Sequence, residues 1–186
     1  MFSEKAKATE QQAASLVARP DAVESVVATG YYTVECVGAD GQVKWSDTIK
    51  NLVVTVGKNA MLDEFFAGSS YDAAWYLGLV DGTTSPTYNA ANTMGSHGGW
   101  TEFTSYSEAA RPAPTWSSAS AGSKATTATS FSINGTGTVA GAFMTTDSTK
   151  SGTTGTLYSA GNFTGGSRSV ASGDTLNVTY TATLTD

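Results

Sequence analysis

The sequence predicts an all-β protein, an antiparallel β-sandwich or jelly roll with one short helix and an N-terminal arm that is partly helical. Three observations lead to this fold class. Short segments alternate apolar and polar residues, turn sequences rich in Gly separate them, and the crossover helices that parallel strands need are missing. Only 14% of the 186 residues are charged, and Ser, Thr, Gly and Ala replace the missing charge, most visibly after Pro114. This composition suits strands, because the β-branched Thr packs well on a pleated surface.

The first 29 residues differ from the rest, so we expect an N-terminal arm at 1–29 and a β-sandwich domain at 30–186. Ala, Glu, Gln and Lys dominate the beginning of the arm and favour helix, and Pro20 then interrupts it. Helices this short are not stable alone. The arm is therefore either a frayed terminus or a segment that becomes ordered on a neighbouring subunit. In the second case we expect its contact residues to be Val17, Val23 and Val26.

Alternation begins in the segment "YYTVECV", where Tyr32, Val34 and Cys36 share one face. The dipeptide Asp40-Gly41 then separates two strand-like runs, which is a strong hairpin signal because both central residues must tolerate positive φ. Cys36 lies on the apolar face, so we interpret it as a small buried hydrophobic residue rather than a reactive thiol. As the one cysteine of the chain, it cannot form an internal disulfide or a thiolate metal cluster.

A further strand, a turn and a helix are expected next. Leu52, Val54 and Val56 alternate as a strand, and Gly57 is expected to turn the chain. A short helix that ends at Gly68 is then predicted from apolar residues at helical spacing, which are Met61, Leu62, Phe65 and Phe66. The apolar run "AAWYLGLVDG" (73–82) follows and is typical of a buried strand.

Strands return in the last third of the chain. The segment "TTATSFSINGTGTVAGAFMTT" is expected to be a second hairpin, with Asn134-Gly135 as its turn. "TGTLYSAGNF" is a weaker strand. The last segment, "DTLNVTYTATLTD", alternates throughout and places one face in a core. Its apolar face comprises Leu176, Val178, Tyr180, Ala182 and Leu184.

Residues 83–125 form a long predicted loop, and a connection of this length is uncommon unless it is functional or ordered by something else. Arg111 is expected to fork onto a carboxylate, Glu102 or Glu108, and so to bridge loop to sheet or subunit to subunit. Large aromatic side chains and arginine dominate protein contacts. The candidate contact residues of the loop are Trp100, Tyr106, Arg111 and Trp116. The alternative is a loop that packs on its own sandwich.

The residues do not favour catalysis, and we expect no catalytic residue, no metal and no cofactor. The chain has one histidine, His97, and one cysteine, whereas zinc needs three or four such ligands. Neither a serine-nucleophile elbow nor a phosphate-binding loop is present, and two carboxylates in a long segment are a weak signal. The net charge of −6 argues against nucleic acid as a partner. No polybasic run, signal peptide or membrane-spanning segment is visible, so no membrane partner is expected.

Three blocks of the sequence, "KWSDTIKNLVVTVGKNAMLDEFF", "AAWYLGLVDG" and "HGGWTEFTSYSEAARP", together resemble a family of small virion structural proteins of tailed bacteriophages. The second block carries W-Y-x-G-L, and the third carries G-W-x-E and Y-x-x-x-x-R-P. The resemblance covers about residues 44–116 and a looser Thr-, Ser- and Gly-rich tail. The first thirty residues lie outside it.

The resemblance implies a non-enzymatic β protein that assembles into the virion. Within this class we favour a head decoration or cement protein, which is made in the bacterial host cytoplasm and lies at the capsid surface. Its implied partners are the major capsid protein, across capsomer seams, and further copies of itself in a homodimer or homotrimer. The alternative is a tail or fibre component, either an adaptor or a module that binds host glycans.

Overall fold

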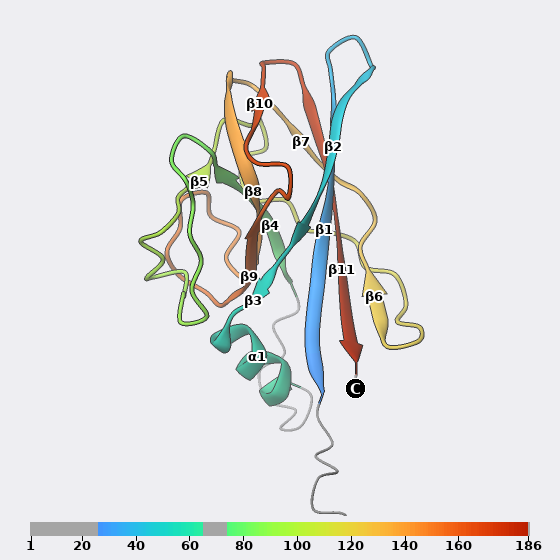
Figure 1. Cartoon of the computed structure of the whole chain (residues 1–186), viewed down its shortest axis with the longest axis vertical. Coiled ribbons are helices and arrows are strands. Elements are labelled where there is room, and N and C mark those ends of the chain that lie inside the picture. The colour runs from blue at the N-terminus through green and yellow to red at the C-terminus, as the bar shows by residue number, and fades with distance from the viewer. Residues whose placement is uncertain (1–25, 65–73, 186) are drawn as a thin grey trace, which may run out of the picture.

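A computed structural model describes residues 26–64 and 74–185 (Figure 1). In these residues the strands form two sheets, and every pair of neighbouring strands is antiparallel. The prediction of an all-β sandwich is confirmed. The described part contains one α-helix, α1 (Thr55–Leu62), at the lower end of the molecule in Figure 1. No described helix is long and apolar enough to cross a membrane.

The first sheet, called sheet A here, is built on the long antiparallel pair of β1 and β11. These strands run in register along their whole length, from Val27 opposite Thr185 to Val37 opposite Thr175. β2 pairs with the other edge of β1, and β6 and β7 pair with successive parts of β11. The members of sheet A are β1 (Val27–Val37), β2 (Val43–Lys50), β6 (Ser123–Ala125), β7 (Thr129–Ser132) and β11 (Thr175–Thr185).

The second sheet, sheet B, has β8 at its centre, with β4 and β9 on either side. β3, β5 and β10 are two or three residues long and extend the sheet at its margins. The members of sheet B are β3 (Leu52–Val53), β4 (Tyr76–Asp81), β5 (Glu102–Phe103), β8 (Gly137–Thr145), β9 (Leu157–Asn162) and β10 (Arg168–Val170).

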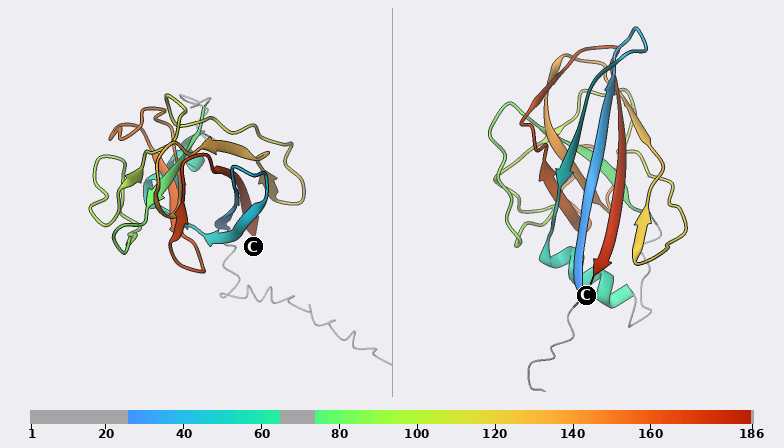
Figure 2. Two further views of the ribbon diagram at one scale, coloured as in Figure 1. Left: turned by 90° about the horizontal axis from the view of Figure 1, so that it is seen from above. Right: turned by 45° about the vertical axis from the view of Figure 1, so that its right-hand side comes forward.

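The main core lies between the two sheets, whose strands surround a common interior when seen from above (Figure 2, left). Sheet A contributes alternate residues to it, so Tyr32, Val34 and Cys36 are fully buried while their neighbours face outward. Leu176, Val178 and Tyr180 do the same on β11, as the alternation predicted. Leu184 is on the same face but is 46% exposed, because it lies close to the free end of the strand.

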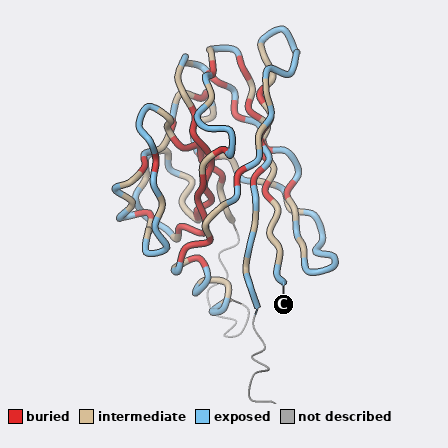
Figure 3. Tube along the Cα trace, in the orientation of Figure 1, coloured by how far each residue is buried: buried red, intermediate tan, exposed pale blue. Residues whose placement is uncertain are grey.

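Sheet B is buried on both faces, and its strands lie along the densest buried region of the molecule (Figure 3). A second apolar cluster covers the face that points away from sheet A, with Val80, Phe143 and Ala160 from the sheet beneath Met94 and Trp100. The predicted long loop at 83–125 therefore acts as a third layer. It also contains β5 and β6, so it is not one unstructured connection.

The hairpin predicted at Asp40-Gly41 is present between β1 and β2, and Gly41 has a φ of 77° there. The hairpin predicted at Asn134-Gly135 is wrong. β7 pairs with β11 in sheet A, whereas β8 belongs to sheet B, so this turn carries the chain from one sheet to the other. Gly135 does not have the positive φ that a tight hairpin turn would require.

The strand and helix after Lys50 are shifted toward the N-terminus. β3 ends at Val53, and α1 begins at Thr55, so Val54 and Val56 are not strand residues. Gly57 lies within the helix, where a Cβ atom would overlap the backbone of Tyr158; the glycine therefore allows close packing on β9, and it is not a turn. Leu62 is 55% exposed, contrary to expectation. The rest of the predicted helix, Phe65, Phe66 and Gly68, lies outside the described residues.

The expected boundary between arm and domain falls inside β1, which begins at Val27. Val26 immediately precedes the strand and is 74% exposed. Val17 and Val23 lie outside the described residues, so the contacts expected of them stay predictions.

Candidate functional site

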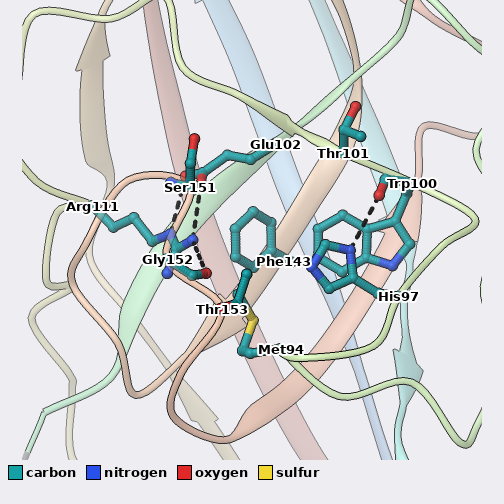
Figure 4. A pocket seen from close by; sticks show the side chains of 10 residues that line it. All are labelled: Met94, His97, Trp100, Thr101, Glu102, Arg111, Phe143, Ser151, Gly152 and Thr153. Atoms are coloured by element: carbon teal, nitrogen blue, oxygen red, sulfur yellow. Dashed lines mark hydrogen bonds and ion pairs between the residues drawn. The ribbon is translucent and has the colours of Figure 1, made fainter.

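The third layer is held to sheet B by a buried ion pair between Arg111 and Glu102, whose side chains are 1% and 5% exposed. Glu102 belongs to β5, and Arg111 follows nine residues later in the loop. Nε of Arg111 donates to Oε1 of Glu102 at 3.0 Å, and Nη2 donates to Oε2 at 2.9 Å (Figure 4). This is the two-bond fork that guanidinium and carboxylate geometry favours. The predicted contact of Arg111 with Glu102 is confirmed, and it bridges loop to sheet.

The ion pair also fixes a second loop, between β8 and β9. Nη1 of Arg111 donates to the carbonyl of Asp147 at 2.8 Å, and Nη2 donates to that of Gly152 at 3.1 Å. The backbone N–H of Ser151 donates to Oε2 of Glu102 at 2.6 Å. Buried charges are costly unless hydrogen bonds satisfy them, and these contacts supply that compensation. We call this group of residues the Arg111 clamp.

Tyr106 lies beside the clamp and is 1% exposed. Its ring packs edge-on against Phe131, with centroids 5.0 Å apart, and its hydroxyl donates to Oε1 of Glu102 at 3.4 Å. Nζ of Lys150 lies 3.7 Å from the ring centroid and donates to the Tyr106 carbonyl at 2.6 Å. Burial and the Glu102 carboxylate raise the pKa of the Tyr106 phenol, so it remains a neutral donor.

His97 and Trp100 form a stacked pair at the other end of the site. Their ring centroids are 4.0 Å apart, and Nδ1 of His97 lies 3.1 Å from the Trp100 carbonyl. The Trp100 ring is 3% exposed and packs on Phe143 of β8 at 4.9 Å. Its Nε1 is buried without a hydrogen-bond partner among the described residues. The histidine thus shields a core tryptophan.

A cavity of about 210 Å³ lies between these two groups (Figure 4). Its charged members, Glu102 and Arg111, are engaged with each other and with backbone groups. The described residues contain no cluster of three or more groups able to hold a metal ion. Of the residues that line the cavity, none forms the nucleophile–base contact that acyl transfer requires. The lining residues are Met94, His97, Trp100, Thr101, Glu102, Arg111, Phe143, Ser151, Gly152 and Thr153.

Three of the four loop residues predicted to contact a partner lie in the interior of the domain. Trp100, Tyr106 and Arg111 are at most 3% exposed, so they offer almost no surface to another protein in this conformation. For these residues the alternative, a loop that packs on its own sandwich, describes the structure. Trp116 is half-buried and packs edge-on against Tyr180 at 6.2 Å.

Glu108, the other predicted partner of Arg111, instead accepts the backbone N–H of Ser132 in β7 at 3.0 and 3.1 Å. The sequence did not reveal the role of residues 147–152, because their contribution to the clamp comes mainly from backbone carbonyls and N–H groups. The residues there are Asp, Ser, Thr, Lys, Ser and Gly, and this composition does not point to Arg111 as a partner.

Cys36 is fully buried, as predicted, and its Sγ lies 3.7 Å from Oδ2 of Asp174. Burial and this carboxylate raise the pKa of the thiol to about 11. The reactive thiolate is therefore on the order of 0.1% of the thiol at pH 8. We expect the folded protein to resist labelling by a thiol-specific reagent at pH 8, and to react fully in denaturant. Fast labelling of the native protein, followed by absorbance, would show that the strand end around Cys36 opens readily.

The fold and the clamp together define a β-sandwich whose third layer is fixed to sheet B by its own buried charges. No family model and no curated protein matches this sequence. The proposal below therefore depends on the three sequence blocks and on what their residues do in the structure.

Proposed function

We propose that this protein is a structural component of a tailed-phage virion, and more specifically a decoration or cement protein that binds across capsomer seams and stabilises the head. Its partners would be the major capsid protein and further copies of itself. No bond is made or broken in this function.

The observation that carries the proposal is that the residues of the three blocks serve packing. Residues of the second and third blocks meet at Phe143 of β8, which belongs to neither block. A Cβ atom on Gly78 would overlap its ring, the Trp100 ring lies 4.9 Å from it, and the guanidinium of Arg111 lies 5.1 Å from it. The N–H of Leu77 also donates to the carbonyl of Pro112 at 2.9 Å, which joins the two blocks directly.

The first block, which contains most of β2, β3 and α1, also serves packing. Trp45 packs edge-on against Phe163 at 5.4 Å, and Nδ2 of Asn51 donates to the hydroxyl of Tyr180 at 3.1 Å. Gly57 allows α1 to lie directly on β9. The residues of the three blocks hold the fold together and do not form a set of exposed reactive groups. This supports a structural function over a catalytic one.

The mechanism is a shift of equilibrium by binding. A protein that binds the assembled shell and not its separated subunits stabilises the shell by mass action. Many copies on one shell multiply a contact that is weak for each copy. An arm at residues 1–26 that becomes ordered on binding would add contact area at modest affinity.

Binding to purified shells tests the proposal. The full-length protein is expected to co-sediment with assembled coat-protein shells at saturating, stoichiometric ratios and to leave free coat subunits unbound. Val26→Asp is expected to weaken binding at least about tenfold, because it removes apolar contact and places a charge in the contact of the arm. Leu62→Asp is the matched control, since Leu62 is 55% exposed on α1, outside both the arm and sheet A.

Equal binding by both variants would show that the arm does not contribute to the contact with the shell. Absence of binding by the unaltered protein would reject a decoration function. The alternative, a tail or fibre component, is favoured by measurable affinity for host surface glycans together with no affinity for shells. The hydroxyl-rich outer face of sheet A would be the natural surface for such a ligand.

A further inference from the structure

The outer face of sheet A is a nearly uncharged surface of hydroxyl groups. Since Tyr32, Val34 and Cys36 point into the core, the residues between them point outward. The same parity on β11 turns its threonines outward. No described ribbon crosses in front of β2, β1 and β11 (Figure 2, right). For example, Thr33 of β1 lies directly between Thr48 of β2 and Thr179 of β11.

Two charged side chains interrupt this face where β1 and β2 pair regularly. Glu35 lies opposite Ser46, and Lys50 lies opposite Tyr31, four residues away along β1. At ~3.4 Å per residue, this separates the two charges by about 14 Å, which is beyond the Debye length at physiological salt. Neither forms an ion pair with another described residue. Within the described ranges, each is thus a charge without an ion-pair partner on this face.

Two copies can approach through this face more easily than elsewhere. The chain has a net charge of −6, so most pairs of surfaces repel each other. Where β2, β1 and β11 pair in regular register, the outer face carries one positive and one negative group, so the charge of this part sums to zero. A two-fold axis that passes between Glu35 and Lys50, near Thr33, would bring each of them opposite its counterpart in the other copy.

We propose that the protein forms a two-fold symmetric homodimer through the outer face of sheet A, in which Glu35 of each copy pairs with Lys50 of the other. A two-fold contact uses the same patch on both copies and must be self-complementary, as this pair of charges is. The dimer deepens the proposed function by naming the surface of self-association, and it rests on that function only for its use in the virion.

The size of the face is sufficient for a specific contact. β1 and β11 have 11 residues each, and the sheet is four strands wide where β6 and β7 lie in line. β2 has 8 residues, and β6 and β7 have 3 and 4, so at ~4.8 Å between strands and ~3.4 Å per residue the face covers roughly 600 Å². A standard interface buries about 800 Å² per partner. Threonine suits it, because the methyl group packs while the hydroxyl donates and accepts across the contact.

Charge reversal tests the proposal on the full-length chain. Sedimentation velocity between 1 and 200 µM, roughly the range of modest self-association, is expected to show a dimer for the unaltered protein. Glu35→Lys and Lys50→Glu are each expected to weaken dimerisation at least about tenfold, because like charges then face each other. The combined variant, Glu35→Lys with Lys50→Glu, is expected to restore it.

The two single variants change the net charge in opposite directions, so a common loss cannot come from general repulsion. Asp63→Lys, at the exposed C-terminal end of α1, is the matched control for Glu35→Lys and is expected to dimerise normally. Circular dichroism of each variant establishes that the fold is retained, since both side chains point away from the core.

A monomeric unaltered protein, a dimer insensitive to the single reversals, or failure of the combined variant to recover would each overturn the proposal. A monomer that still binds shells would reject the dimer and leave the proposed function standing. A dimer that responds to the charge reversals as expected but does not bind shells would support the dimer and reject the proposed function.

Discussion

Replacing Arg111 with alanine is expected to lower the free energy of unfolding by about 3–5 kcal/mol, the usual cost of breaking one side of a buried ion pair. The loss is large because Glu102 stays in a 5% exposed site and loses both bonds of the fork, while the loop at 147–152 loses two bonds from the guanidinium. Urea denaturation followed by tryptophan fluorescence measures the change, and Trp100 itself reports on the third layer.

Two further variants give this measurement its control. Arg111→Lys keeps the charge but cannot form the planar fork, so an intermediate loss is expected. Lys58→Met removes an exposed charge on α1 and should change the free energy of unfolding by less than about 0.5 kcal/mol. A loss below about 1 kcal/mol for Arg111→Ala would mean that the loop is held to sheet B mainly by its apolar contacts.

Gly141→Ala is expected to destabilise the protein by about 3 kcal/mol or more, at the upper end of what overpacking costs. Gly141 lies in the middle of β8, and a Cβ atom there would overlap the carbonyl group of Gly161 on the neighbouring strand. A backbone atom in a central ladder cannot move aside without breaking the pairing of β8 with β9. Thermal unfolding followed by circular dichroism measures the effect.

Gly98→Ala is the matched control for this substitution. Gly98 lies in the loop, has no atom within 4 Å of the added Cβ and does not have a positive φ. Its replacement is expected to be neutral or to stabilise the protein by up to about 1 kcal/mol. Equal effects at both positions would show that glycine entropy, and not the close approach of β8 and β9, determines the result.

Sequence reasoning predicted correctly the strands that have one buried face, and also the buried apolar run that contains β4. On β1 and β11 the period of two is visible because one side faces the core and the other faces solvent. β8 and β9 in sheet B lack this signal, since both are buried on both faces; β8 is a largely apolar run, whereas β9 also contains Ser159 and Asn162. The second covering layer, formed by the loop, could not be inferred from those runs.

Turn sequences were informative only where local geometry determined the connection. Asp40-Gly41 forms a hairpin because the strands on either side of it, β1 and β2, pair directly with each other. After Asn134-Gly135 the next strand enters the other sheet, and that choice depends on β11, some 40 residues later in the chain. A dipeptide signal does not carry such long-range information.

The candidate site shows the same limit. The sequence indicated that Arg111 would fork onto Glu102 or Glu108, which belong to the same short segment, and in the structure the partner is Glu102. The burial of that fork depends on residues 147–152 and on Phe143, which are far away in the sequence. Large side chains expected to anchor a partner, such as Trp100 and Tyr106, therefore turned out to anchor the domain's own third layer.

The copy number of this protein in purified particles of a tailed phage that carries its coding sequence tests the proposed virion function most directly. Quantitative mass spectrometry against the major capsid protein is expected to find it in a fixed ratio to coat subunits, with many copies per head. A handful of copies per particle would contradict the decoration function and favour the tail or fibre alternative. Complete absence from the particle would contradict a structural function in the virion altogether.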